Sequence, residues 1–191
     1  MAIATAYIME QTGLYFIAIL PPPQIMQEVT AIKQEFAGRF QSRHALKVPP
    51  HITLKEPFQM LFKNEAPLST ALNTFFNKFD SFEIALRNFG CFANKQNPVI
   101  FIQPDENLFL QKLYQGLMDF LQKTGFFRAA ITRPFHPHMT VAYRDLSMDN
   151  FKKAWLEFSK RTYYETFSVT EIWLLHHTGN VWIPYQSFTL K

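Results

Sequence analysis

The amino-acid sequence predicts an α+β protein built from two related halves. Strand-like and helix-like segments alternate along the chain in the order β, α, β, α, β, β, α, β, α, β, β. The stretch Pro50-His51-Ile52-Thr53-Leu54 returns as Pro137-His138-Met139-Thr140-Val141, with the two histidines 138 − 51 = 87 positions apart. A helix-like segment precedes and follows each copy. A duplicated α+β unit explains both observations.

The first half opens with a buried strand over residues 13–20, which ends in the run Tyr-Phe-Ile-Ala-Ile-Leu and stops at three prolines. A helix follows, ending near Gly38. Its apolar side chains recur at helical spacing, at Ile25, Val29, Ile32 and Phe36. The first His-Thr strand then runs from Pro49-Pro50 to Glu56-Pro57.

A second helix and a half-buried strand complete the first half. Pro67 suits the first turn of this helix. Its inner face consists of Leu68, Leu72, Phe75 and Phe79. Over residues 82–87 apolar side chains alternate with Glu83, Ala85 and Arg87, which is typical of a strand with one buried face.

The second half repeats this plan. Residues 99–102 predict a strand, and Pro104-Asp105 opens a third helix that Gly125 ends. The inner face of that helix is Leu110, Leu113, Leu117 and Phe120. The second His-Thr strand runs from about His136 to Arg144.

A fourth helix and a hairpin close the chain. Ser147 is the predicted cap of the helix, and its inner face is Phe151, Trp155 and Phe158. One strand over residues 166–175, a turn at Thr178-Gly179-Asn180 and a strand over residues 181–190 form the hairpin.

The composition is that of a globular protein. The 191 residues can bury a real core, and we expect one two-lobed domain over residues 1–191. A hydrophobic share of 48% and a charged share of 18% exclude a disordered chain. The net charge of +4 favours a phosphate-bearing partner, but no run of like charge predicts a broad nucleic-acid surface.

Cysteine use and the first residues bear on location. The single cysteine, Cys91, fits a reducing compartment, and its apolar neighbours predict a buried side chain rather than a nucleophile. The first ten residues contain no basic leader and no long apolar run. We therefore expect a cytoplasmic monomer with no membrane partner.

The two motifs place chemically useful side chains together. On a strand, residues i and i+2 share a face and lie about 7 Å apart, so an imidazole and a hydroxyl reach one anion of phosphate size. In-line displacement at phosphorus needs a base and an acid on opposite sides of the phosphate. Histidine suits both roles near neutral pH, and threonine hydroxyls can hold the non-bridging oxygens.

These residues resemble a known family. The paired His-x-Thr motifs, their separation, the helix and strand order, and the closing hairpin with Trp182 and Phe188 are similar to the two-histidine (2H) phosphoesterases, in the bacterial 2'-5' RNA ligase-like branch. The resemblance covers essentially the whole chain. It implies a two-lobed α+β fold with mostly antiparallel sheets, a central cleft and helices packed outside.

The resemblance also implies an activity. Such enzymes open a 2',3'-cyclic phosphate of a nucleotide or RNA end to a 2'-phosphate without a metal or other cofactor, and members are associated with 2'-5' RNA joining. His51, Thr53, His138 and Thr140 match the family's catalytic positions. For a cyclic substrate, His138 is assigned as the base and His51 as the acid.

Further side chains are candidates for contacts with the substrate. Lys55 shares the strand face of His51, and Arg133 lies just before the second His-Thr strand. Relatives often carry arginine five positions after the second histidine, where this chain has Tyr143 followed by Arg144. We expect Lys55, Arg133, Tyr143 or Arg144 to contact the phosphate or the base, and the departure at Tyr143 leaves the preferred substrate open.

Two other functions fit some of the same residues. A non-catalytic module could use the cleft to bind a nucleotide or an RNA terminus, although arginine or lysine would suffice for that. A zinc or iron site could combine His136 and His138 with His176-His177. No acidic ligand stands at a characteristic spacing, and adjacent histidines on a strand point to opposite faces, which argues against this site.

Overall fold

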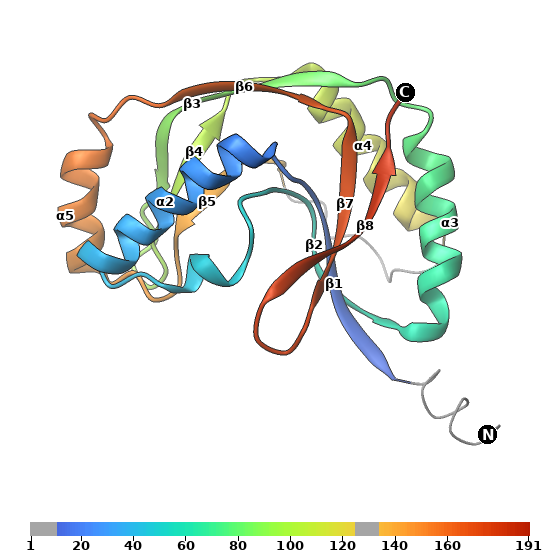
Figure 1. The fold of residues 1–191 in the computed structure, drawn as a ribbon, viewed down its shortest axis with the longest axis horizontal. Coiled ribbons are helices and arrows are strands. Elements are labelled where there is room, and N and C mark those ends of the chain that lie inside the picture. Colours follow the sequence, from blue (N-terminus) through green and yellow to red (C-terminus); the bar gives the residue numbers. More distant parts are fainter. Residues whose placement is uncertain (1–10, 125–133) are drawn as a thin grey trace.

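Two antiparallel sheets of four strands each form the frame of the protein, with helices gathered at its two ends (Figure 1). The computed structural model describes residues 11–124 and 134–191. The first sheet has the order β2 (Ile52–Leu61), β1 (Thr12–Ile19), β7 (Glu171–His177) and β8 (Trp182–Thr189). The second has the order β5 (Met139–Ala142), β4 (Val99–Pro104), β3 (Phe82–Phe92) and β6 (Tyr164–Val169).

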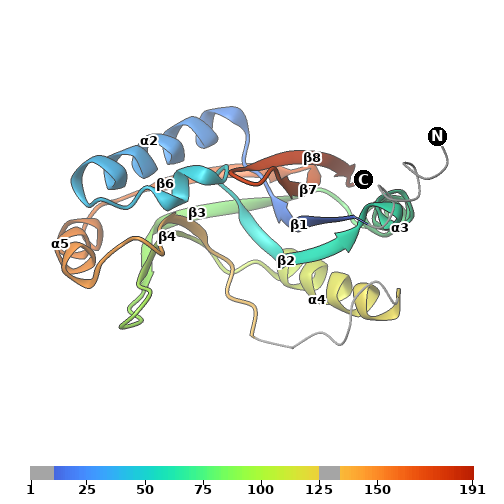
Figure 2. The same cartoon turned by 90° about the horizontal axis from the view of Figure 1, so that it is seen from below.

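The helices form two pairs, one at each end of the molecule. Helix α2 (Pro23–Arg39) lies near α5 (Met148–Phe158), and α3 (Glu65–Phe76) lies near α4 (Leu108–Lys123), as Figure 2 shows. Contacts between phenylalanine rings join the members of each pair. The centroids of Phe36 and Phe158 are 4.4 Å apart, and those of Phe75 and Phe120 are 4.7 Å apart. Within the described residues no helix is long and apolar enough to cross a bilayer.

The strand order confirms a duplicated α+β unit. In each half a central strand leads through a helix to an edge strand beside it: β1, α2 and β2 in the first half, and β4, α4 and β5 in the second. Each half then sends a strand into the other sheet, because β3 pairs with β4 and β7 pairs with β1. Both His-Thr motifs therefore belong to edge strands, and β2 contacts β5.

The closing segment differs from the expectation. Residues 166–175 do not form one strand, because β6 ends at Val169 in the second sheet and β7 begins at Glu171 in the first. The buried positions change phase at this point, from Phe167 and Val169 to Ile172 and Leu174. The consecutive polar residues Thr170-Glu171 are the sequence signal of this change. The predicted hairpin thus consists of β7 and β8 alone.

The first His-Thr strand is longer than predicted. Strand β2 continues through Glu56-Pro57 to Leu61. Proline is tolerated here because β2 is an edge strand, and the register with β1 slips between Tyr15 and Ile17, opposite this proline.

Three other boundaries also shift. Strand β5 spans only Met139–Ala142, shorter than the predicted 136–144. Helix α4 starts at Leu108 rather than at Pro104-Asp105, because the Asn107 side chain accepts a hydrogen bond from the amide of Leu110 at 2.9 Å. Gly125, its predicted end, lies outside the described residues. Ser147 does cap α5, accepting from the amide of Asn150 at 3.2 Å.

A phenylalanine cluster ties α2 and α5 to the second sheet. The ring of Phe158 is fully buried and lies 4.4 Å from Phe36, 5.0 Å from Phe89 and 6.2 Å from Phe40, between centroids. One large hydrophobic core joins these residues to side chains from both sheets. The two ends of the molecule therefore share a core.

The substitution Phe158→Ala should lower the free energy of unfolding by about 3–5 kcal/mol, because it removes a buried ring and leaves a cavity. Urea denaturation followed by circular dichroism measures this loss. Leu156→Ala on the same helix is the control, since Leu156 is 72% exposed, and it should stay within about 0.5 kcal/mol of the wild type. Equal effects of the two changes would contradict this description of the core.

Candidate active site

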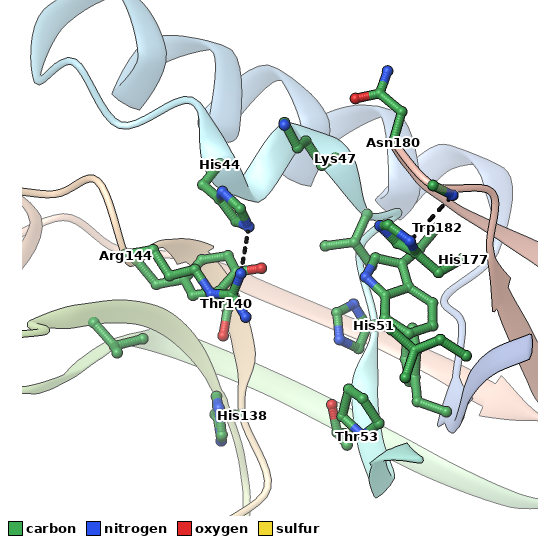
Figure 3. A pocket seen from close by; sticks show the side chains of 17 residues that line it. His44, Lys47, His51, Thr53, His138, Thr140, Arg144, His177, Asn180 and Trp182 are labelled. Carbon is green, nitrogen blue, oxygen red and sulfur yellow. Dashed lines mark hydrogen bonds between the residues drawn. The ribbon is translucent and has the colours of Figure 1, made fainter. Parts of the chain in front are cut away.

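A cleft of about 600 Å³ lies between the two edge strands that carry the His-Thr motifs (Figure 3). His51 and Thr53 line it from β2 and the loop before β2, and His138 and Thr140 line it from β5 and the loop before β5. The other lining residues are Leu14, Phe16, His44, Lys47, Val48, Pro57, Val99, Tyr143, Arg144, His177, Gly179, Asn180 and Trp182. None of these described residues is an aspartate or a glutamate, so the cleft suits an anion.

Strand pleating places the motif side chains as the sequence predicts. Ile52 and Leu54, which alternate with the first pair, are at most 2% exposed. Met139 and Val141, which alternate with the second pair, are fully buried. Apolar positions anchor each strand in the core, and the histidines and threonines face the cleft.

Both histidines are held by the same local hydrogen bond. The Nδ1–H of His51 donates to the carbonyl of Pro49 at 2.8 Å, and the Nδ1–H of His138 donates to the carbonyl of His136 at 2.7 Å. In each case the acceptor lies two residues earlier in the chain. The bond fixes the tautomer, so Nε2 is the nitrogen left to exchange a proton with a bound molecule.

Aromatic rings pack behind both imidazoles. Phe16 of β1 lies 4.9 Å from His51, and Phe101 of β4 lies 5.3 Å from His138, between centroids. Phe92 of β3 adds an edge contact with His138 at 5.2 Å. Because β1 and β4 are corresponding strands, the two halves support their histidines in the same way.

Burial keeps both imidazoles neutral. It lowers the pKa of His51 to about 3, and the nearby positive charge of Lys33 acts in the same direction. Burial also lowers the pKa of His138. In the free protein at neutral pH, both Nε2 atoms are therefore unprotonated and able to accept a proton.

One end of the cleft is formed by a polar cluster. Arg144 donates from Nη1 to Nε2 of His44 at 3.1 Å, and the ring of Tyr143 meets His44 edge-on at 5.1 Å between centroids. The carboxylate of Asp145 accepts from the Ser42 hydroxyl at 3.0 Å and from the amides of Arg43 and His44 at 2.8 and 2.9 Å. Asp145 thus joins the loop after β5 to the loop before β2.

The opposite end is aromatic. Trp182 lies edge-on to Phe16 at 4.6 Å and to His177 at 4.9 Å, between centroids. The Nδ1 atom of His177 accepts from the amide of Gly179 at 3.2 Å, which ties it to the turn between β7 and β8. Asn180 of the same turn also lines the cleft (Figure 3).

The predicted contact residues separate into three groups. Tyr143 and Arg144 line the cleft. Lys55 lies on β2 opposite Ile17 and is not among the described residues that line the cleft. Arg133 lies outside the described residues.

Sequence reasoning missed several lining residues. His44 and Lys47 belong to a short 3-10 helix between α2 and β2, and Trp182 and Asn180 belong to the turn region of the last hairpin. In the sequence, only the basic residues around His44 and its nearness to the first motif indicate that it could line the cleft. The sequence indicates Trp182 and Asn180 only as parts of the closing hairpin and its turn. The exchange of β7 into the first sheet is what brings them to the cleft.

The histidines do not assemble into a metal site. Among residues 11–124 and 134–191, no three His, Cys, Asp or Glu side chains are placed to share an ion. His176 packs instead on Tyr15 and Tyr185, with centroids 4.9 and 5.9 Å away, whereas His177 faces the cleft. The zinc or iron alternative therefore has no support in the arrangement of the described residues.

The fold and the paired histidines define the class, and comparison with known proteins defines the family. The family model described as "2'-5' RNA ligase superfamily" matches residues 21–181. The chain belongs to this superfamily, and with it to the two-histidine phosphoesterases, as the sequence resemblance implies.

Relatives and solved structures agree with this placement. A protein of Oceanobacillus iheyensis named "Putative phosphoesterase OB1230" is 29% identical over 184 residues, covering 92% of this chain and 97% of its own. A protein of Geobacillus kaustophilus named "Putative phosphoesterase GK0864" is 26% identical over 178 residues, covering 91% and 94%. E. coli LigT complexed with 3'-AMP has the same fold, with a TM-score of 0.69, 19% identity, and coverage of 95% and 99%.

The low pKa of His51 makes stability depend on pH. The unfolded chain binds a proton at His51 below about pH 6.5, whereas the folded protein resists this proton until about pH 3. Stability contributed by the neutral imidazole is therefore present above pH 6.5 and is lost as the pH falls toward 3. Urea denaturation at pH 4 to 7 should show a shallower pH dependence for His51→Asn, by up to about 1.4 kcal/mol per pH unit. Identical slopes in both proteins would contradict this environment for His51.

Proposed function

We propose that the protein is a phosphoesterase that hydrolyses 2',3'-cyclic phosphates of nucleotides or RNA ends to 2'-phosphates. One observation carries the proposal: two histidines with the same Nδ1 hydrogen bond face one cleft from corresponding strands, and each is accompanied by a threonine. This arrangement matches what in-line displacement at phosphorus requires, a proton acceptor and a proton donor on opposite sides of the phosphate.

The proposed reaction assigns one step to each side chain. One imidazole takes a proton from water through Nε2 as the water oxygen attacks phosphorus. The other imidazole, protonated once the anionic substrate is bound, gives its proton to the departing 3'-oxygen of the ribose. The hydroxyls of Thr53 and Thr140 donate to the non-bridging oxygens, whose negative charge must be held in the transition state.

The remaining cleft residues fit a nucleotide. Arg144 and Lys47 supply positive charge near one end, and the indole of Trp182 supplies a stacking surface near the other. The O. iheyensis and G. kaustophilus relatives carry the phosphoesterase name. Solved structures of E. coli LigT hold 3'-AMP, NADP+, ATP and phosphate, so proteins of this fold take nucleotides and phosphate.

The same displacement extends to 2'-5' joining of RNA ends. A ribose 5'-hydroxyl then replaces water as the nucleophile: one histidine takes its proton as the oxygen attacks the phosphorus of the cyclic phosphate, and the other protonates the departing 3'-oxygen, which leaves a 2'-5' phosphodiester. Both reactions use the same four side chains, so one set of variants tests both.

Substitution of either histidine by alanine should lower kcat for a 2',3'-cyclic nucleotide at least about 1,000-fold, since each removes a proton-transfer group. Thr53→Ala and Thr140→Ala should each lower kcat by about 10- to 1,000-fold. His176→Ala is the control, because His176 packs on Tyr15 outside the cleft, and it should keep wild-type turnover. Product release is followed by chromatography, with circular dichroism to verify folding and EDTA added to show that turnover needs no free metal.

Unchanged turnover in His51→Ala or His138→Ala would rule out this mechanism. No turnover of any cyclic phosphate by the wild type, together with saturable binding of nucleoside monophosphates, would instead indicate a binding module that uses the same cleft.

A further inference from the structure

A buried lysine stands behind the first of the two histidines. Lys33 lies on the inner face of α2, where its neighbours at helical spacing are Val29 and Phe36, and it is 1% exposed. Among the described residues it is the only charged side chain that is fully buried, and it forms no ion pair with a carboxylate. Burying an ammonium without an ion pair costs free energy. The spacing of its neighbours is that of the apolar face of the helix, where a lysine is unusual, so a function for Lys33 is expected.

The hydrogen bond of Lys33 leads directly to the first motif. Its Nζ donates to the carbonyl of Val48 at 3.0 Å, and the next carbonyl along the chain, that of Pro49, accepts the Nδ1–H of His51 at 2.8 Å. Pro49 and Pro50 have no amide hydrogen, so their backbone cannot be held through donors of its own. Lys33 therefore fixes the short segment from which His51 projects.

The second half has no counterpart of this lysine among the described residues. Helix α4 takes the corresponding place, and its inner face is entirely apolar, with Leu110, Leu113, Leu117 and Leu121 buried. The two histidines share the same backbone hydrogen bond and similar aromatic packing. Among the described residues, a buried ammonium lies behind His51 alone, whereas His136 is the neighbour that opposes protonation of His138.

We propose that Lys33 is a positioning residue that holds the Val48–His51 segment and, through its buried positive charge, opposes protonation of His51. The role of the charge follows from electrostatics, because a fixed cation opposes the addition of a second positive charge nearby. Neither part of the proposal depends on the proposed function.

The charge is present when it is needed. Burial lowers the pKa of Lys33 to about 7, so the ammonium is charged throughout the acidic range in which His51 would take up a proton. The other titratable groups that line the cleft are His44, Lys47, His138, Tyr143, Arg144 and His177. Of these, His138 also opposes protonation of His51, and Lys33 is the stronger influence.

The inference is tested first on the free protein, without substrate. The 15N chemical shifts of the histidine rings are followed by NMR from about pH 2.5 to 8 in the wild type, Lys33→Met and Lys33→Gln, a range that includes the pKa of about 3 of His51. Methionine keeps the volume without charge, and glutamine keeps a donor without charge. In both variants His51 should become protonated at a pH higher by roughly one unit than in the wild type, with a smaller change at His138.

Lys47→Met is the matched control, since it removes the same charge from an exposed lysine that lines the same cleft. It should leave the protonation of His51 unchanged, because solvent screens an exposed charge. Protonation of His51 at the same pH in the wild type and in both Lys33 variants would overturn the proposal. Failure of Lys33→Met alone to fold leaves Lys33→Gln to decide.

The second test uses turnover. Lys33→Gln should move the limb of the profile of kcat/KM against pH that His51 controls upward by the same roughly one unit, whether His51 acts as acceptor (acidic limb) or as donor (alkaline limb). A purely structural role would change kcat or KM without moving either limb, and it would overturn the electrostatic part. If no substrate is turned over, the proposed function fails while the NMR titration still decides the effect of the charge on His51.

Discussion

The exchange of strands between the two sheets is the constraint on which the site depends. After α3 the chain enters the second sheet as β3, and after α5 and β6 it returns to the first sheet as β7. This leaves β2 and β5 as edges that contact each other. The pleat of each edge strand then turns its apolar residues into the core and its His-Thr pair into the space between the sheets. Neither half could form the cleft by itself.

Duplication makes the centre of the cleft symmetric, while its surroundings are not. The same hydrogen bond to the carbonyl two residues earlier orients both imidazoles. At one end, Asp145 ties the loop carrying His44 to the loop carrying Arg144, and at the other the last hairpin presents Trp182. Lys33 adds a buried charge behind His51. A symmetric pair can exchange protons in either direction, so we expect these unequal surroundings to orient a bound substrate.

Much of this could be predicted from the sequence, because its signals were local. The His-Thr spacing and the apolar residues between them correctly predict which side chains face the cleft, and Ser147 predicts the start of α5. The sequence predicts β6 and β7 as one strand, because the buried positions change phase over only two residues, Thr170 and Glu171. Trp182 and Lys33 could not be assigned, since their places depend on contacts between segments far apart in the chain. A lysine on a helix is ordinarily exposed, and nothing in the sequence marks Lys33 as buried.

We expect one phosphate to be held between the two histidines. A crystal structure of the protein soaked with inorganic phosphate, or with a nucleoside 2'-phosphate, tests it most directly. The phosphorus should lie between the Nε2 atoms of His51 and His138, with each nitrogen about 2.6–3.2 Å from a phosphate oxygen and the hydroxyls of Thr53 and Thr140 on the others. A phosphate that contacts only one of the histidines, or that binds at His44 and Arg144 away from both, would contradict the account.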